Sequence, residues 1–401
     1  MLEKLYEDSE IKINYHKVKD SKVILIVFNP LEWGASDGDI WGYSVLSRSG
    51  YSILGITSKL KNWFPDASVY GSLPSISPIL RGYSNRLTYG YSMGGYAALR
   101  YSKALGASHV LAFSPQSTID PKDLGKEDRR YTQYFSEVKN KGMKILSSEI
   151  SGEVYIIYDK CFSLDRNHVV MLGFENFNGV NLSRTGHGSI RVLAKSRSIL
   201  EIIELTLNNK NSIEIRNKLV RYRRFIPEYY ESMMILAAKR SRWSLIDSLF
   251  LRAKDNDLAS LSVKRKYAEL LSNQRRYKDA VTALYGLENN NVLNQVGTYF
   301  ILDKQYPEAI SVLSKLVENS KNIHFCRNLA KAYELSGDTS SALSSLASFE
   351  SDNLNNPDFL CHFGRLLAVN KQTNRGRELC QLAVTLRPAE PYFTRILESI
   401  G

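Results

Sequence analysis

A glycine-flanked serine lies between a strand-like run and a helix-forming run at residues 87–100. The stretch reads Leu-Thr-Tyr-Gly-Tyr-Ser-Met-Gly-Gly-Tyr-Ala-Ala-Leu-Arg, so that Ser92 stands between Gly90 and Gly94 in the pattern G-x-S-x-G. A sharp strand-to-helix turn strains such a serine, and the two glycines leave room for neighbouring backbone. We therefore expect the Ser92 hydroxyl to stand exposed at the carboxyl edge of a sheet, where the N–H of Met93 points to the same place.

A Gly-rich loop of this kind can also be a plain turn or a phosphate cradle. No Lys-Ser/Thr pair follows this loop as a P-loop requires, and the G-x-G-x-x-G spacing of a dinucleotide site is absent from the sequence. Residues Gly90 to Gly95, in their strand-turn-helix setting, instead resemble the nucleophile turn of the α/β-hydrolases. The resemblance implies a mostly parallel sheet with helices on both faces, and catalytic residues in the order Ser, Asp or Glu, His.

That order narrows the choice of a catalytic base. Four of the six histidines are set aside because they precede the serine, open an apolar strand or lie in the helical second half: His16, His109, His324 and His362. His187 lies in the Gly-flanked loop 183–189 after the last expected strand, where an α/β-hydrolase carries its histidine. His168 lies in a helix-like run, as a local partner or a surface residue. We therefore predict His187 as the base.

Two carboxylates compete to be the acid. Asp159 ends the apolar run 154–158, and Asp165 lies six residues further, at an expected helix start. Asp165 has a structural alternative, because an Asp at a helix start can cap its first N–H groups. We prefer Asp165 as the group that orients the imidazole and keep Asp159 as the alternative; the other carboxylate would hold the loop.

The oxyanion hole needs a second donor besides the N–H of Met93. The family takes it from the loop after the strand 23–28, which here reads Asn-Pro-Leu-Glu-Trp from residue 29 and lacks the usual His-Gly. Because Pro30 has no N–H, the expected donor is the N–H of Leu31 or the side chain of Asn29.

Two further stretches are expected near the site. The segment 33–64 is rich in aromatic residues, and the candidates for contact with a sugar ring or an acyl chain are Trp33, Trp41 and Tyr91. Core packing explains such residues equally well. The stretch 114–144 lies where the family often inserts a cap over the site, so it is expected to help select the substrate; its charges otherwise indicate a solvated face.

The β pattern stops near residue 208. Before it, apolar runs alternate with helix-like runs, as in a parallel sheet covered by helices. The expected strands are Val23–Phe28, Ser52–Ile56, Leu87–Gly90, His109–Phe113, Val154–Tyr158 and Val180–Leu182, with Ile11–Tyr15 paired antiparallel to the first of these. We expect an α/β domain over 1–208, a basic helical connector over 209–261 and helical repeats over 262–401.

Small residues recur at a regular period in the helical half. Ala268, Gly297, Ala330 and Gly364 are 29, 33 and 34 positions apart, and each is followed twelve residues later by a second small residue: Ala280, Ala309, Ala342 and Gly376. Small side chains let two antiparallel helices approach where they cross. The pattern resembles four degenerate tetratricopeptide (TPR) repeats, which implies a concave surface for a protein or polymer partner. A non-repeating helical bundle is the alternative.

Composition limits the classes of function. The 401 residues are 43% hydrophobic and 23% charged, which excludes disorder as the main state. The four cysteines are far apart, so neither disulfides nor a metal site is expected, and no cofactor is predicted. The beginning of the chain is polar and no run approaches about 18 apolar residues, so we expect a cytoplasmic protein without a transmembrane segment.

Half of the net charge of +12 lies in one stretch. Residues 210–242 carry nine basic and three acidic side chains, interleaved with Tyr222, Phe225, Tyr229 and Tyr230. Such a surface suits a polyanion or a membrane face, and solvated linker helices are the alternative. No recognised nucleic-acid module accompanies it, so nucleic acid is not expected.

Three functions fit these residues. The first is a serine hydrolase that cleaves an ester or a related acyl bond. The second uses the same residues to pass an acyl group to a sugar hydroxyl, with acetyl-CoA as co-substrate, because the chain also resembles bacterial surface-glycan acetyltransferases. The third is an adaptor that binds through its repeats and has an inert hydrolase half.

Overall fold

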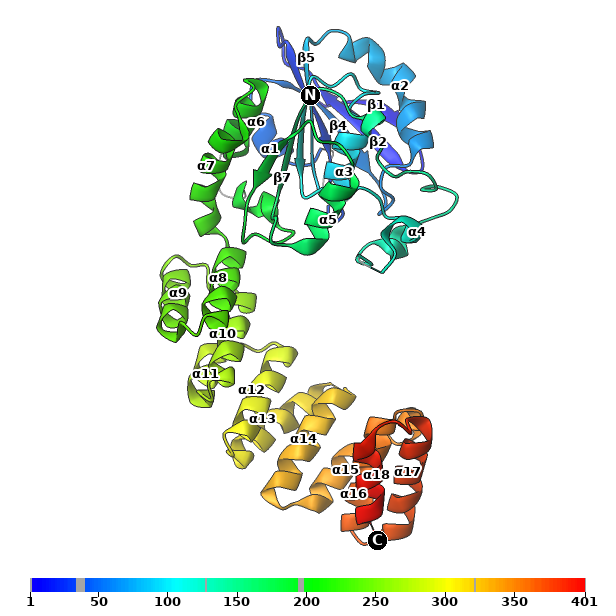
Figure 1. Ribbon diagram of the computed structural model, residues 1–401, viewed down its shortest axis with the longest axis vertical. Coiled ribbons are helices and arrows are strands. Elements are labelled where there is room, and N and C mark those ends of the chain that lie inside the picture. Colours follow the sequence, from blue (N-terminus) through cyan, green and yellow to red (C-terminus); the bar gives the residue numbers. More distant parts are fainter. Residues whose placement is uncertain (1, 34–39, 127, 194–197, 321, 401) are drawn as a thin grey trace. The chain divides into compact units, whose positions relative to one another are not determined.

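The computed structural model describes residues 2–33, 40–126, 128–193, 198–320 and 322–400. The chain forms two compact units, Met1–Met233 and Met234–Gly401 (Figure 1). The division between them falls inside 209–261, the stretch expected to be a connector.

An eight-stranded sheet in the described residues organises the first unit. The strands follow one another in space as β1-β2-β4-β3-β5-β6-β7-β8. Their bounds are β1 Glu3–Glu7, β2 Ile11–His16, β3 Val23–Phe28, β4 Ser52–Ser58, β5 Asn85–Tyr91, β6 His109–Phe113, β7 Glu153–Tyr158 and β8 Asn178–Asn181. The strands from β4 to β8 are all parallel, whereas β1 and β2 run antiparallel at one end. The mostly parallel sheet agrees with the sequence pattern.

The predicted pairing of Ile11–Tyr15 with Val23–Phe28 is wrong. β2 pairs instead with β4, where Ile13 lies opposite Ile56, and with β1, a strand that the sequence pattern does not indicate. The reason is that β3 has parallel neighbours, β4 and β5, on both sides and so has no free edge. Its unbroken apolar run is typical of a strand buried on both faces.

Helices cover both faces of the sheet, as expected (Figure 1). On one face, α2 Asp66–Leu80, α3 Met93–Arg100 and α5 Ser163–Met171 contribute to one apolar core. On the other face, α6 Ser198–Leu207 and α7 Ser212–Tyr222 contribute to a second one. The short helices α1 Tyr43–Leu46 and α4 Pro121–Leu124 lie in connecting segments. Because Ile215 and Leu219 of α7 are fully buried, the start of the expected connector packs with the sheet.

The carboxyl ends of β3, β5, β6, β7 and β8 lie along one edge of the sheet. The pairs Phe28 with Gly90, Tyr91 with Phe113, Phe113 with Ile157 and Tyr158 with Asn181 show this alignment. The segments that follow these strands therefore start side by side, and every residue predicted for the triad lies in one of these segments, Asp165 in the first turn of α5.

The second unit consists of helical hairpins in the described residues. The helices from the junction onward are α8 Pro227–Lys239, α9 Trp243–Asp255, α10 Leu261–Asn273, α11 Tyr277–Leu284, α12 Asn290–Leu302, α13 Tyr306–Asn319, α14 Ile323–Ser336, α15 Thr339–Ala347, α16 Pro357–Val369, α17 Thr373–Leu386 and α18 Pro391–Ser399. A Cβ atom at Gly364 would lie 2.6 Å from the carbonyl oxygen of Gly376, and one at Gly376 would lie 2.4 Å from that of Gly364. At Gly364 and Gly376 the periodic small residues thus mark a position where paired helices touch, which is the packing that the repeat pattern predicts.

Candidate active site

Ser92 occupies a strained turn between β5 and α3. Its backbone has φ 54° and ψ −118°, a conformation that side-chain-bearing residues rarely adopt and that costs about 1–3 kcal/mol. A Cβ at Gly90 would lie 2.2 Å from the carbonyl oxygen of Gly94, and one at Gly94 would lie 2.4 Å from that of Phe28. Both glycines are therefore required by close backbone packing, as the motif predicts.

The Ser92 hydroxyl is not exposed, contrary to expectation. Ser92 is fully buried. Its Oγ is surrounded by His187 and by Gln116, whose amide Nε2 lies 3.3 Å away. The residues that follow β6 thus close over the turn, an effect that a local motif cannot reveal.

His187 and Asp165 complete a chain of hydrogen bonds to Ser92. His187 Nε2 lies 3.0 Å from Ser92 Oγ, and His187 Nδ1 lies 2.9 Å from each carboxylate oxygen of Asp165. A carboxylate oxygen accepts hydrogen bonds, so this geometry suits a proton on Nδ1 and leaves Nε2 to accept one from Ser92. Asp165 is fully buried in the first turn of α5.

Asp159 holds the loop that carries His187. Its Oδ2 accepts hydrogen bonds from the backbone N–H groups of Arg184 at 2.8 Å, Thr185 at 3.0 Å and Gly186 at 3.0 Å. Arg184 and Gly186 both have positive φ, so this bend needs support. The geometry therefore gives Asp159 the supporting position and Asp165 the position beside the imidazole.

The start of α3 lies against the end of β3, because a Cβ at Gly94 would meet the carbonyl oxygens of Phe28 at 2.4 Å and Asn29 at 2.9 Å. Met93 begins α3, and the first N–H groups of a helix have no partner within it. The Asn29 amide nitrogen donates to the carbonyl oxygens of Pro30 at 3.2 Å and Trp33 at 2.6 Å, so this side chain shapes the loop. Because the Asn29 amide is already bound within the loop, the backbone N–H of Leu31 stays the candidate for the second donor to the oxyanion.

The aromatic candidates divide between the site and the core. Tyr91 lies beside the triad, because its ring centroid is 5.3 Å from that of His187. Trp41 stacks on Tyr89 at 5.2 Å and joins the core on the α6 and α7 face. Trp33 is half-buried in the loop after β3.

The stretch 114–144 supplies site residues that the sequence pattern does not identify individually. The Tyr131 hydroxyl lies 3.0 Å from His187 Nε2, and Arg130 Nη2 lies 3.0 Å from Asp165 Oδ1. Burial raises the pKa of Tyr131, so the phenol keeps its proton near neutral pH. The expected position of this stretch over the site is thus observed, but Arg130 is not on a solvated face.

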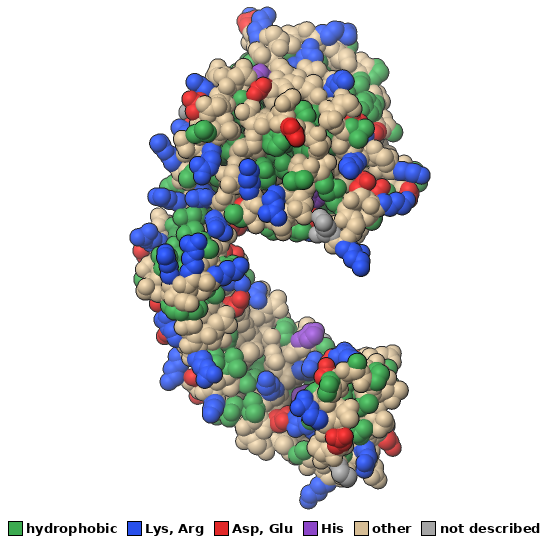
Figure 2. Space-filling model, viewed as in Figure 1, with side chains coloured by type: hydrophobic (Ala, Val, Ile, Leu, Met, Phe, Trp, Pro, Cys, Tyr) green, Lys and Arg blue, Asp and Glu red, His purple; other side chains and the backbone are tan. Residues whose placement is uncertain are grey.

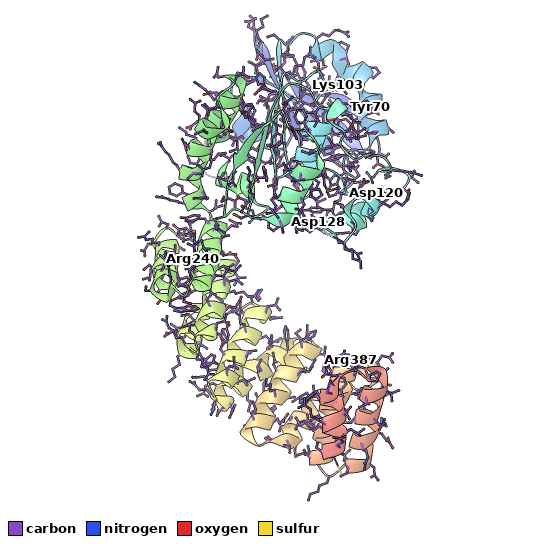
Figure 3. The ribbon with its side chains drawn as sticks, in the orientation of Figure 1. Tyr70, Lys103, Asp120, Asp128, Arg240 and Arg387 are labelled. Atoms are coloured by element: carbon purple, nitrogen blue, oxygen red, sulfur yellow. The ribbon has the colours of Figure 1, made fainter. Side chains whose placement is uncertain are left out.

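A second buried histidine ties this stretch to α5. His168 Nδ1 accepts from the backbone N–H of Ser117 at 3.1 Å, and its Nε2 lies 3.2 Å from Asp128 Oδ2. Asp128, labelled in Figure 3, lies beside α5 and also pairs with Arg130 at 2.6 Å. Burial by itself would raise the pKa of Asp128, but hydrogen bonds from His168 and Arg130 hold it well below its ordinary value. His168 is therefore a buried local partner and not a surface residue.

The basic stretch 210–242 spans α7, a short turn and α8. Lys and Arg side chains gather over these helices in Figure 2, and Arg240, labelled in Figure 3, follows α8. Of the interleaved aromatics, Tyr230 is buried and Tyr222 and Tyr229 pack against the core beneath α7, whereas Phe225 is 50% exposed. Most of the aromatic residues of this stretch thus pack inside the protein and are not part of an exposed surface.

Neither a metal cluster nor a membrane-spanning helix is found in the part of the chain that the structure describes. Its His, Cys, Asp and Glu side chains form no group of three or more that could hold an ion. None of its helices is long and apolar enough to cross a bilayer.

No protein-family model matches the chain, and no curated protein matches its sequence. Solved structures resemble parts of it. The TPR protein YrrB is 16% identical over 45% of this chain and 95% of its own, with a TM-score of 0.37. The acylaminoacyl peptidase of Pyrococcus horikoshii is 15% identical over 52% of this chain and 42% of its own, with a TM-score of 0.38.

The capsule O-acetyltransferase of Neisseria meningitidis serogroup A is 15% identical over 51% of this chain and 93% of its own, with a TM-score of 0.37. Likenesses at this level carry no argument about activity. The function is therefore argued from the geometry of this chain.

Proposed function

We propose that the chain is a serine-dependent enzyme that cleaves an ester or a related acyl bond. The observation that carries the proposal is the continuous hydrogen-bonded chain from Asp165 through His187 to Ser92, with distances of 2.9 Å and 3.0 Å. A strained serine, an oriented imidazole and a buried carboxylate together make a weak nucleophile reactive.

Each group has one role in the proposed reaction. Ser92 Oγ attacks the acyl carbon while its proton passes to His187 Nε2, and Asp165 stabilises the imidazolium that forms. The N–H groups of Met93 and Leu31 receive the developing oxyanion. His187 then gives its proton to the leaving group, and a second hydroxyl, from water or from another acceptor, releases the acyl group from Ser92.

A second candidate is acyl transfer to a hydroxyl compound such as a glycan, with acetyl-CoA as the acyl donor. The observation that favours it is the closed surroundings of the nucleophile: Ser92 is fully buried, and the side chain of His187 is only 17% exposed. Acetyl-CoA and candidate glycans are supplied together to test it. Acetylated glycan supports transfer, and CoA release without an acetylated product contradicts it.

The repeats are proposed to bind an anionic partner, a protein or a polymer. They contain a hollow of about 580 Å³, lined largely by polar and basic side chains on α12, α14, α16 and α18. Within the described residues, neither Arg327 nor Lys331 pairs with a carboxylate there. A double variant, Arg327→Gln with Lys331→Gln, should weaken binding of a polyanion such as heparin in a salt-dependent way; unchanged binding contradicts this role.

A role as adaptor alone is less well supported, because it would not require the strained conformation of Ser92 or its alignment with two further side chains. The discriminating experiment uses the full chain, a fluorophosphonate probe and small acyl esters. We expect the wild type to be labelled at Ser92 and to cleave the esters, and Ser92→Ala to do neither. Full ester cleavage by Ser92→Ala contradicts the proposal.

A further inference from the structure

The phenol of Tyr131 is held against the base of the triad. Its hydroxyl lies 3.0 Å from His187 Nε2, the same nitrogen that contacts Ser92 Oγ. Its ring centroid is 5.3 Å from the ring of Trp63, and the guanidinium carbon of Arg130 lies 5.2 Å from the same centroid. Trp63 is buried, so these contacts fix the phenol in place.

The Tyr131 hydroxyl occupies the position that the second substrate, the acyl acceptor, must take. Once Ser92 is acylated, its oxygen has no proton to share with His187. The molecule that releases the acyl group has to set an O–H against Nε2, because this nitrogen takes the proton as the oxygen attacks.

We propose that Tyr131 holds the acceptor position of the acyl-enzyme and thereby slows its hydrolysis, and that the acceptor which displaces the phenol is a bound hydroxyl compound. The proposal rests on the proposed function of Ser92, His187 and Asp165. A water molecule that displaces the phenol only replaces one hydrogen bond by another. A larger acceptor brings additional contacts, and their free energy offsets the displacement.

Gln116 offers one of these contacts. Its amide is fully buried, and its Nε2 donates toward Ser92 Oγ at 3.3 Å and the Ser114 carbonyl oxygen at 3.4 Å. Its Oε1 is buried and has no hydrogen-bond partner among the described residues. A buried acceptor without a partner costs free energy, and a hydroxyl of a bound molecule would satisfy it. The acceptor class is therefore a polyol or sugar, with one hydroxyl for acylation and another for Gln116.

The transfer step balances without a further reactant. The acceptor oxygen forms a bond to the acyl carbon, and the bond between that carbon and Ser92 Oγ breaks. The acceptor proton passes to His187 Nε2 and from there to Ser92 Oγ. The products are the acylated polyol and the free enzyme, whereas water in the same step gives the free acid.

The test measures how fast the acetyl-enzyme releases its acetyl group to water and how much glycerol is needed to divert that group. The full chain is mixed with p-nitrophenyl acetate, without or with glycerol, and acetate, acetylglycerol and nitrophenol are quantified for the wild type and Tyr131→Phe. Because the phenol no longer competes with water in the variant, we expect Tyr131→Phe without glycerol to hydrolyse acetyl-Ser92 roughly threefold to tenfold faster than the wild type, the factor for one ordinary hydrogen bond. Tyr134→Phe is the matched control, because the Tyr134 ring also packs against Trp63, with ring centroids 5.8 Å apart.

The two proposals fail in different ways. If the wild type forms no acetyl-Ser92, the proposed function itself is wrong. If Tyr131→Phe forms acetyl-Ser92 and hydrolyses it at the rate of the wild type, only the role of Tyr131 is overturned. Gln116→Met gives an independent reading: it should raise the glycerol concentration needed for half-maximal transfer, and an unchanged concentration contradicts the polyol assignment.

Discussion

Arg130 Nη2 lies 3.0 Å from Oδ1 of Asp165, the carboxylate that also contacts His187. The same guanidinium nitrogen lies 2.6 Å from Asp128 Oδ2, so that one cation joins two buried carboxylates. Burial by itself would lower the pKa of Arg130, but Asp128 and Asp165 raise it above its ordinary value, and the side chain stays charged. The stretch over the site and the triad are therefore electrostatically linked.

Removing this cation should destabilise the fold. Arg130→Gln leaves two buried carboxylates without their shared partner, and breaking a buried ion pair in this way costs about 3–5 kcal/mol. Chemical denaturation of the full chain measures the change in the free energy of unfolding. Arg129→Gln, the same substitution at the adjacent exposed arginine, is the control and should stay near the wild type; equal effects of both variants would contradict the account.

The two candidate acids should respond differently to the same change. Asp165→Asn removes the charge beside His187 and is expected to lower kcat by about 10³- to 10⁴-fold, with a small effect on KM. Asp159→Asn loosens the bend at Arg184 and Gly186, so it should lower stability more than it lowers kcat per folded molecule. Steady-state kinetics and thermal unfolding of both variants check this, and the opposite pattern would assign the acid to Asp159.

Asp128 should make stability depend on pH in a defined direction. Its pKa in the folded chain lies below the unfolded value of about 3.9, so its contribution is present above that pH and is lost as the pH falls through the folded pKa. Asp128→Asn is expected to lose about 1–3 kcal/mol at pH 7 and progressively less below pH 4. Denaturation at several pH values measures the difference, and a constant difference between the two proteins would argue against this role.

The backbone contact at Gly94 should tolerate no side chain. A Cβ there would lie 2.4 Å from the carbonyl oxygen of Phe28, so Gly94→Ala forces β3 and α3 apart. We expect a loss of at least about 1–3 kcal/mol and of reactivity at Ser92. Gly71→Ala is the control, because its Cβ would meet only the Tyr6 hydroxyl at 3.5 Å. Comparable stability of the two variants would be inconsistent with the packing described.

Sequence patterns predict the features that depend on residues close together in the chain. The turn at Ser92 follows from two glycines and a strand-to-helix change, and the paired helices follow from small residues such as Gly364 and Gly376. The order of residues along the chain and the Gly-flanked loop after the last strand indicate His187, whereas the order leaves Asp159 and Asp165 both possible. The structure brings His187 and Asp165 to Ser92. Their catalytic roles stay predictions.

These patterns do not predict contacts between segments that are far apart in the sequence. Tyr131 is placed by Trp63, and Asp128 is placed by His168, forty residues away. No periodicity connects such residues, so the charges near Arg130 suggested a solvated face. The position of β2 depended in the same way on β3 having neighbours on both sides.

The most direct test of the central claim is the mass of the peptide that contains Ser92. The full chain is mixed with p-nitrophenyl acetate, quenched in acid within the first turnover, digested and analysed by mass spectrometry beside Ser92→Ala. The account predicts one acetyl group on Ser92 of the wild type and none on the corresponding peptide of the variant. Turnover of the ester without acetyl-Ser92, or with equal speed in Ser92→Ala, would contradict it.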